Sequence, residues 1–190
     1  MLHRPSAVLI AFAFASLSIS IDGTVVAPAE FREIVNGSEI IAFGRVVDAT
    51  PELSDDRHRV ETVVTLQVAT YLKGGPGETL VFVVPGGQIG RYRDVLVGAP
   101  TFEPGEEAVV FLNARVGERP TVFGLYQGVF RIRVDESSKR RLVVSPVLVA
   151  AGQAPERVVR GAATRRPVTL ETFGAQVQSV VAEGALRGAR

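Results

Sequence analysis

The chain of 190 residues contains no cysteine and no tryptophan, and its only histidines are His3 and His58. Without cysteine it has no disulfide scaffold, no thiolate metal site, no cysteine nucleophile and no attachment site for a lipoprotein anchor. A zinc site takes three or four His, Cys or carboxylate ligands, and among these only carboxylates are plentiful here. We therefore expect no metal and no other cofactor, and a fold whose stability comes from packing.

The chain also lacks an excess of charge of either sign, because 21 Lys and Arg residues stand against 20 Asp and Glu residues, for a formal net charge of +1. Apolar residues make up 46% of the chain, which is enough to bury a core. Basic residues gather toward the C-terminal end, but only 139–141 and 165–166 are adjacent. That scatter favours a solvated surface over a tail that binds polyanions, and nucleic acid is not an expected partner.

The first 29 residues have the pattern of an export signal. A short basic start precedes an apolar run over residues 6–21, and Ala27 and Ala29 are small residues suitably placed before a cleavage site after residue 29. A second candidate cleavage site follows Ser20. The run of about 16 residues is shorter than the roughly 20 of a membrane-spanning helix. We predict a cleaved signal peptide over 1–29 and an exported protein, periplasmic or secreted, with an uncleaved anchor as the alternative.

Strand patterns dominate the mature chain. From 59 to 72, apolar or Thr side chains at the even positions alternate with mostly polar ones at the odd positions, which predicts a strand. At about 3.3 Å per residue this strand spans roughly 45 Å, a length typical of strands that coil around small barrels. We predict the other strands over 40–47, 79–84, 108–112, 122–134 and 142–144, with Gly44, Gly124 and Gly128 at bends or bulges and a loop over 50–57.

Two helices are expected, one at each end of this β region. Residues 30–37 form a short helix, and residues 168–187 form an amphipathic helix with Thr169 as its N-cap and Gly184 and Gly188 at its end. The chain then divides into a barrel domain over 30–149, a Gly-, Pro- and Arg-rich linker over 150–167, and the C-terminal helix. We expect the apolar stripe of that helix to pack on the barrel, although it can also serve a partner.

Three segments carry a resemblance to a known fold family. Residues 38–46 (SEIIAFGRV), 64–74 (VTLQVATYLKG) and 105–112 (GEEAVVFL) resemble the first strand, the second strand with its turn, and a later strand of the netrin-like module. That module is the variant of the oligonucleotide/oligosaccharide-binding (OB) barrel found in tissue inhibitors of metalloproteinases. The whole layout also resembles a family of exported bacterial proteins. The resemblance covers residues 38–134 and implies an OB-like barrel of five to six strands that binds proteins or polyanions.

The absence of cysteine limits what this resemblance implies. In the metalloproteinase inhibitors an N-terminal cysteine chelates the zinc of the target, and disulfides hold that segment in place. This chain has no cysteine, so the inhibitory mechanism does not carry over to it. Only the fold and the general tendency to bind are implied.

No pattern of catalytic residues is found. His58 lies among charged loop residues, where a solvated histidine is favoured over a catalytic base, and no Gly-x-Ser-x-Gly sequence is present. The adjacent pairs Asp55 with Asp56 and Glu106 with Glu107 do not follow a calcium-loop spacing. We expect no catalytic, metal or cofactor residue, and we keep a carboxylate-dependent hydrolase as the alternative function.

The segment 85–107 is the strongest candidate for a ligand site, because it is a long stretch without a clear strand or helix. Gln88, Arg91, Tyr92 and Arg93 give its middle a cationic, hydrogen-bonding character suited to carboxylate or phosphate. The other interpretation is that the loop covers the barrel end, with apolar side chains packed inward at 95–97 and Phe102.

The sequence therefore predicts an exported, non-enzymatic binding module for a protein or an anionic ligand held at the 85–107 loop. The hydrolase and a structural protein of the cell envelope are the alternatives. The ligand and the oligomeric state do not follow from the sequence.

Overall fold

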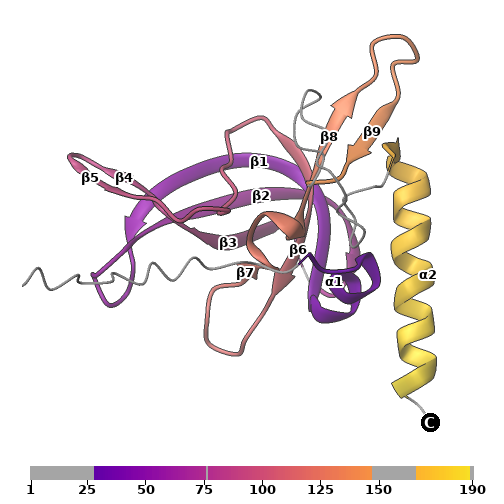
Figure 1. Cartoon of the computed structure of the whole chain (residues 1–190), viewed down its shortest axis with the longest axis horizontal. Coiled ribbons are helices and arrows are strands. Elements are labelled where there is room, and N and C mark those ends of the chain that lie inside the picture. The colour runs from indigo at the N-terminus through magenta and orange to yellow at the C-terminus, as the bar shows by residue number, and fades with distance from the viewer. Residues whose placement is uncertain (1–27, 76, 147–165, 189–190) are drawn as a thin grey trace, which may run out of the picture.

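The computed structural model describes residues 28–75, 77–146 and 166–188 (Figure 1). The predicted signal peptide therefore lies outside the described residues except for Pro28 and Ala29. The same holds for the predicted linker 150–167, of which only residues 166 and 167 are described.

The described part of the chain is mainly β, with a short helix before the strands and a longer one after them, as the sequence predicts. The elements are, in chain order, α1 (Phe31–Gly37), β1 (Ile40–Leu53), β2 (Val60–Lys73), β3 (Thr79–Pro85), β4 (Gly87–Ile89), β5 (Tyr92–Asp94), β6 (Glu107–Asn113), β7 (Thr121–Val122), the 3-10 helix η1 (Leu125–Gly128), β8 (Val129–Val134), β9 (Arg141–Val144), β10 (Val168–Thr169) and α2 (Leu170–Gly188).

Five strands close a barrel in the order β1-β2-β3-β7-β6, and β6 pairs back with β1. The closing pairs run from Ile40 opposite Leu112 to Arg45 opposite Glu107. Neighbouring barrel strands are antiparallel, except that β3 and β7 are parallel where Val83 lies opposite Thr121. Beyond the barrel, β8, β9 and β10 continue the sheet from β6. The closed barrel confirms the predicted fold class.

The long strand β2 follows the predicted alternation over most of its length. Val64 and Leu66 are fully buried in the barrel core, whereas the next residue, Gln67, is exposed. The pairing with β1 then skips Ala69 and Leu72, and each unpaired residue reverses the faces of the residues that follow it. Tyr71 consequently packs on the barrel core and Leu72 packs outside it. The regular alternation of faces predicted over 59–72 is therefore interrupted at this end of the strand.

Gly44 lies beside the first of these bulges, as expected from a glycine inside a strand. The register of β1 against β2 shifts between Phe43 and Gly44. A Cβ atom at Gly44 would lie 2.3 Å from the carbonyl oxygen of Gln67 and 2.9 Å from Cγ of Leu66. Only a residue without a side chain allows the two strands to approach this closely.

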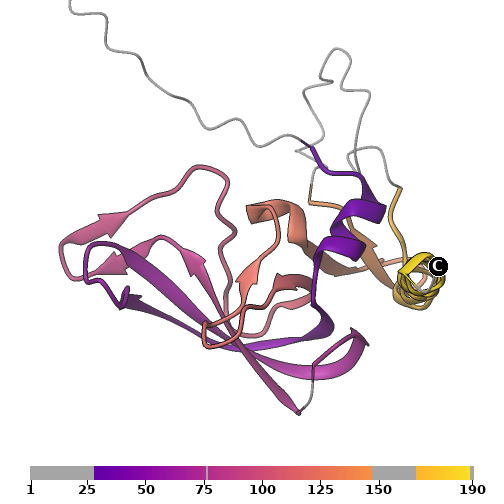
Figure 2. The same ribbon diagram turned by 90° about the horizontal axis from the view of Figure 1, so that it is seen from below.

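A second core lies on the outer face of the barrel, under the two helices. Phe31 of α1, Phe111 of β6, Phe130 of β8 and Phe173 of α2 contact one another, with centroid separations from 5.0 to 6.3 Å. Figure 2 shows α2 nearly end-on beside the barrel and close to α1. The predicted packing of the helix on the barrel is thus observed.

The start of α2 has the predicted cap. The backbone N–H of Thr172 donates to Oγ1 of Thr169 over 3.2 Å, which satisfies one of the unpaired amides of the first turn. The helix continues through Gly184 and ends at Gly188.

Two strand boundaries differ from the prediction. The expected loop over 50–57 begins later, because β1 continues to Leu53 and pairs with β2 up to Val60. Pro51 is tolerated there because β6 pairs with β1 only through Arg45, so this part of β1 is an edge. The expected strand over 122–134 is divided into β7, η1 and β8. Gly124 and Leu125 adopt left-handed conformations with φ of 54° and 58°, which break the strand.

Candidate functional site

The segment 85–107 is not a plain loop, because it contains a β-hairpin formed by β4 and β5. Gly87 pairs with Asp94, Gln88 with Arg93, and Ile89 with Tyr92. Gly90 begins the tight turn with φ of +57°, a conformation that glycine adopts without strain. The hairpin projects at the end of the barrel far from α2 (Figure 1). The expectation of a segment without strands is therefore wrong. The two strands leave little pattern in the sequence, because each spans only three residues and glycines surround the first.

The hairpin register divides the four predicted ligand-binding residues into two pairs. Gln88 and Arg93 lie directly opposite each other and both line a groove beside the hairpin. Tyr92 pairs with Ile89 and therefore points to the other face of the hairpin. All four side chains are exposed, so each is accessible, but they do not converge on one point.

Arg91 and Tyr92 contact each other at the hairpin tip. The Arg91 guanidinium lies 5.3 Å from the centre of the Tyr92 ring, and its Nη2 donates to the Tyr92 hydroxyl over 3.3 Å. The amide of Gln88 donates to the carbonyl of Gly90 over 3.1 Å. Two of the four predicted residues thus form a cation–π pair of their own, and a third supports the turn.

The groove beside the hairpin has a volume of about 470 Å³. Its floor is apolar, and at its base the buried Phe102 ring packs edge-on against Phe82 of the barrel core, with centroids 5.3 Å apart. The lining residues are Ala49, Pro51, Thr62, Val84, Pro85, Gly86, Gly87, Gln88, Arg93, Asp94, Val95, Leu96, Ala99, Pro100, Thr101 and Phe102.

Two hydrogen bonds that involve side chains help to fix the hairpin to the barrel. The backbone N–H of Val60 donates to the Asp94 carboxylate over 3.3 Å, and the Thr62 hydroxyl donates to the carbonyl of Gly86 over 2.7 Å. Both donors belong to β2, so the groove wall is held by the longest pairing in the barrel. The Asp94 carboxylate is engaged with backbone and is half-buried.

Three consecutive apolar side chains are exposed directly after the hairpin. Val95, Leu96 and Val97 are 65%, 45% and 90% exposed, whereas Phe102 is buried. The interpretation that all four pack inward is therefore right for Phe102 and wrong for the other three. Phe102 packs in the barrel core. The described residues leave the side chains of 95–97 largely uncovered.

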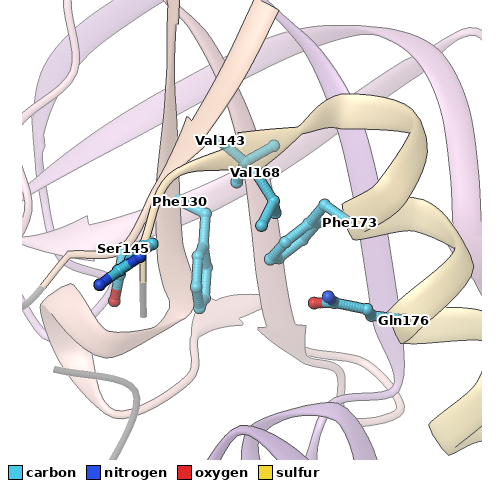
Figure 3. Close-up of a pocket in the computed structure, with 7 residues that line it drawn as sticks. Phe130, Val143, Ser145, Val168, Phe173 and Gln176 are labelled. Carbon is cyan, nitrogen blue, oxygen red and sulfur yellow. The ribbon is translucent and has the colours of Figure 1, made fainter. Parts of the chain in front are cut away.

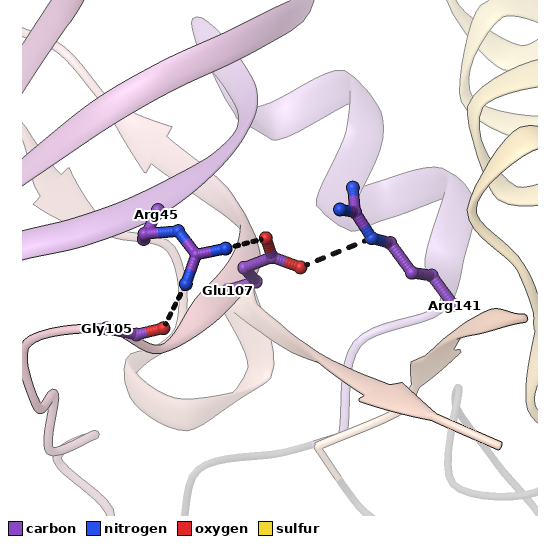
Figure 4. Close-up of polar contacts among 4 residues, drawn as sticks. All are labelled: Arg45, Gly105, Glu107 and Arg141. Atoms are coloured by element: carbon purple, nitrogen blue, oxygen red, sulfur yellow. Dashed lines mark hydrogen bonds and ion pairs between the residues drawn. The ribbon is translucent and has the colours of Figure 1, made fainter. Parts of the chain in front are cut away.

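Of the adjacent carboxylates considered as calcium ligands, Glu106 and Glu107 are engaged in ion pairs with different partners. Glu106 contacts Arg131, and Glu107 contacts Arg45 over 2.6 Å and Arg141 over 3.6 Å (Figure 4). A hydrogen bond from Ser54 lowers the pKa of Asp56. This direction is opposite to the one that a general acid requires.

His58 lies exposed in the turn between β1 and β2, where its backbone N–H donates to Asp56 over 3.0 Å. Within residues 28–75, 77–146 and 166–188, no three His, Asp or Glu side chains gather as ligands of a metal would.

A smaller cavity of about 270 Å³ lies between the start of α2 and the strands β8 and β9 (Figure 3). The contacting rings of Phe130 and Phe173 line it, together with the polar side chains of Ser145 and Gln176. Among the described helices, none is both long enough and apolar enough to span a bilayer.

The hairpin groove is therefore lined by the guanidinium of Arg93 and by apolar side chains, among them Val95 and Leu96 of the exposed strip 95–97. Comparison of the chain with protein-family models, with curated proteins and with solved structures gives no match.

Proposed function

We propose that this chain is an exported binding module that holds an apolar, acidic segment of a partner protein in the groove at the β4–β5 hairpin. The exposure of Val95, Leu96 and Val97 beside that groove carries the proposal. Contiguous apolar surface rimmed by polar groups is a feature of protein-binding sites, because water around it is released on contact.

The charges around the groove favour an acidic partner. Within the described residues the Arg93 guanidinium makes no hydrogen bond or ion pair, and Arg91 contacts only Tyr92. The acidic group of the lining, Asp94, accepts a hydrogen bond from the backbone of Val60. A carboxylate of a ligand can pair with Arg93 in two parallel hydrogen bonds while its apolar neighbours cover 95–97.

We further propose that the barrel is OB-like and related to the netrin-like module. Its strand order, with a parallel contact between the third and last barrel strands, supports the first part, since the OB-fold is a five-stranded Greek-key barrel. The three resembling segments fall on β1, on most of β2 with the start of the turn after it, and on nearly all of β6. Export of the protein stays a prediction. The two alternative functions, a carboxylate-dependent hydrolase and a structural protein of the cell envelope, also stay predictions.

Binding of synthetic peptides tests the proposal. We expect a peptide that alternates Leu or Val with Glu to bind, and the same peptide with Lys in place of Glu to bind at least about tenfold more weakly. Arg93→Glu and Val97→Asp should each abolish most of this binding.

The loop between β6 and β7 offers a matched control. Arg115 and Val116 are an adjacent, exposed pair of the same residue types outside the groove. Arg115→Glu and Val116→Asp should leave peptide affinity unchanged. Equal losses in both pairs of variants, or no binding by either peptide, would overturn the proposal.

A further inference from the structure

A second cleft, of about 600 Å³, lies between the first turns of α2 and the outer face of the barrel. It is separate from the hairpin groove and shares no lining residue with it. The lining consists of Phe43, Thr70, Leu72, Arg140, Arg141, Thr169, Leu170, Glu171, Gly174 and Ala175. Its volume falls within the range of about 300–1,000 Å³ that is typical of small-molecule sites.

The bulges of β2 produce one wall of this cleft. Because the pairing with β1 skips Ala69 and Leu72, the side chains of Thr70 and Leu72 lie on the outer face beside Phe43 of β1. A regular strand would place Thr70 and Leu72 on the barrel side, where Val68 lies.

Small residues of α2 leave the opposite side open. Phe173 and Val177 bury themselves against the barrel, but the adjoining flank of the helix carries Gly174 and Ala175. A Cβ atom at Gly174 would lie 3.6 Å from Cδ2 of Leu72, so the helix backbone itself stands close to the wall. The wall formed by Phe43, Leu72 and Gly174 is thus hydrocarbon.

One end of the cleft is cationic. Nε of Arg141 lies 3.6 Å from Glu107, which also holds Arg45 over 2.6 Å. Figure 4 shows the contact of Glu107 with Nε of Arg141 and no such contact with the two terminal nitrogens of that guanidinium. Within the described residues these nitrogens have no partner, and Arg140 adds a second exposed guanidinium to the lining. Glu171 is the acidic member of the lining, so the positive charges outnumber it.

We propose that this cleft binds a free single-chain amphiphile with an acidic head, such as a fatty acid. The carboxylate pairs with the terminal nitrogens of Arg141, which Glu107 holds in position, and the alkyl chain lies over Phe43, Leu72 and Gly174. Charge complementarity selects the head, and the hydrocarbon wall selects the chain. This site stands independently of the function proposed for the hairpin groove.

Isothermal titration calorimetry of the protein with dodecanoate, below the critical micelle concentration of dodecanoate, tests the inference. We expect binding at one site, with affinity rising about fourfold for each methylene added between octanoate and dodecanoate. Dodecyltrimethylammonium and dodecanol should bind about tenfold more weakly or worse, because neither pairs with a guanidinium. Equal affinity for the anionic and cationic amphiphiles would overturn the proposal.

Variants locate the site. Ala175→Trp should fill the cleft and abolish binding, and Ala182→Trp, on an exposed part of α2 outside the lining, should leave binding unchanged. Arg141→Gln should weaken dodecanoate about tenfold, and Glu171→Gln should strengthen it. The melting temperature of each variant shows that it is folded. Full binding by folded Ala175→Trp, or association with anionic vesicles in the absence of any dodecanoate binding, would refute a fatty-acid site here.

Discussion

The backbone N–H of Ala29 donates a hydrogen bond of 2.6 Å to Oε1 of Gln127, a side chain 98 positions later in the chain that is 3% exposed. Ala29 also packs against the outer core. The next residue, Glu30, caps α1 through a reciprocal capping box with Glu33. The chain segment before α1 is therefore tied to η1 and to the aromatic core beneath the helices.

A protein that begins at Glu30 should be less stable than one that begins at Pro28. It lacks the hydrogen bond to Gln127, and it places a positive α-amino group at the positive end of α1. We expect a loss of about 1–2 kcal/mol in the free energy of unfolding, measured with urea. Of the two predicted cleavage sites, the one after Ser20 retains the contact. Equal stability of the two proteins would show that the contact with Gln127 contributes nothing.

Leu66→Ala should lower the free energy of unfolding by about 2–5 kcal/mol, because it opens a cavity in the barrel core. Gln67→Ala should have almost no effect, since that side chain is exposed. Denaturant unfolding of both variants checks the inward and outward faces of β2. Similar losses at the two positions would contradict a barrel with separate faces.

Gly44→Ala should destabilise the protein by about 1–3 kcal/mol, because the new methyl group overlaps the carbonyl of Gln67 and the strands must separate. Gly174→Ala serves as the control. Its methyl group meets Leu72 at an ordinary contact distance of 3.6 Å, and alanine favours the helix by about 0.5–1 kcal/mol. We expect thermal unfolding to shift in opposite directions for these two variants, and a shift in the same direction would contradict this account of the bulge.

The loop between β8 and β9 depends on pH through Asp135. Hydrogen bonds from the Ser137 hydroxyl and the Ser138 N–H lower the pKa of Asp135 from 3.8 to about 2. Because the pKa is lower in the folded protein, the charged side chain stabilises the loop above about pH 4, and this contribution is lost as the pH falls toward 2. Ser137→Ala should raise the pKa of Asp135, as followed by NMR titration. An unchanged pKa would mean that the Ser137 hydroxyl is not a partner in solution.

The barrel was predictable because burial on one face leaves a period of two in the sequence, as at Val64, Leu66 and Gln67. The bulges at Ala69 and Leu72 were not, since they depend on which residues of β1 lie opposite. Gly124 was predicted as a bend or bulge within one strand, but its left-handed conformation ends the strand there.

The candidate site was predictable in composition and not in arrangement. Gln88, Arg91, Tyr92 and Arg93 were identified from their chemistry, which is local to the sequence. Their division between two faces follows from the turn at Gly90, which three-residue strands do not reveal. The exposure of 95–97 was equally hidden, because an apolar run carries no sign of whether a neighbour covers it.

Charge reversal at Arg93 tests the proposed binding groove most directly. The measurement is the affinity of the wild-type protein and of Arg93→Glu for two apolar peptides that differ in carrying Glu or Lys. We predict that the wild type prefers the Glu peptide and that Arg93→Glu prefers the Lys peptide, with a reversal of about tenfold or more in the ratio of affinities. The same preference in both proteins would contradict the account, because the charge at the groove would then play no part in recognition.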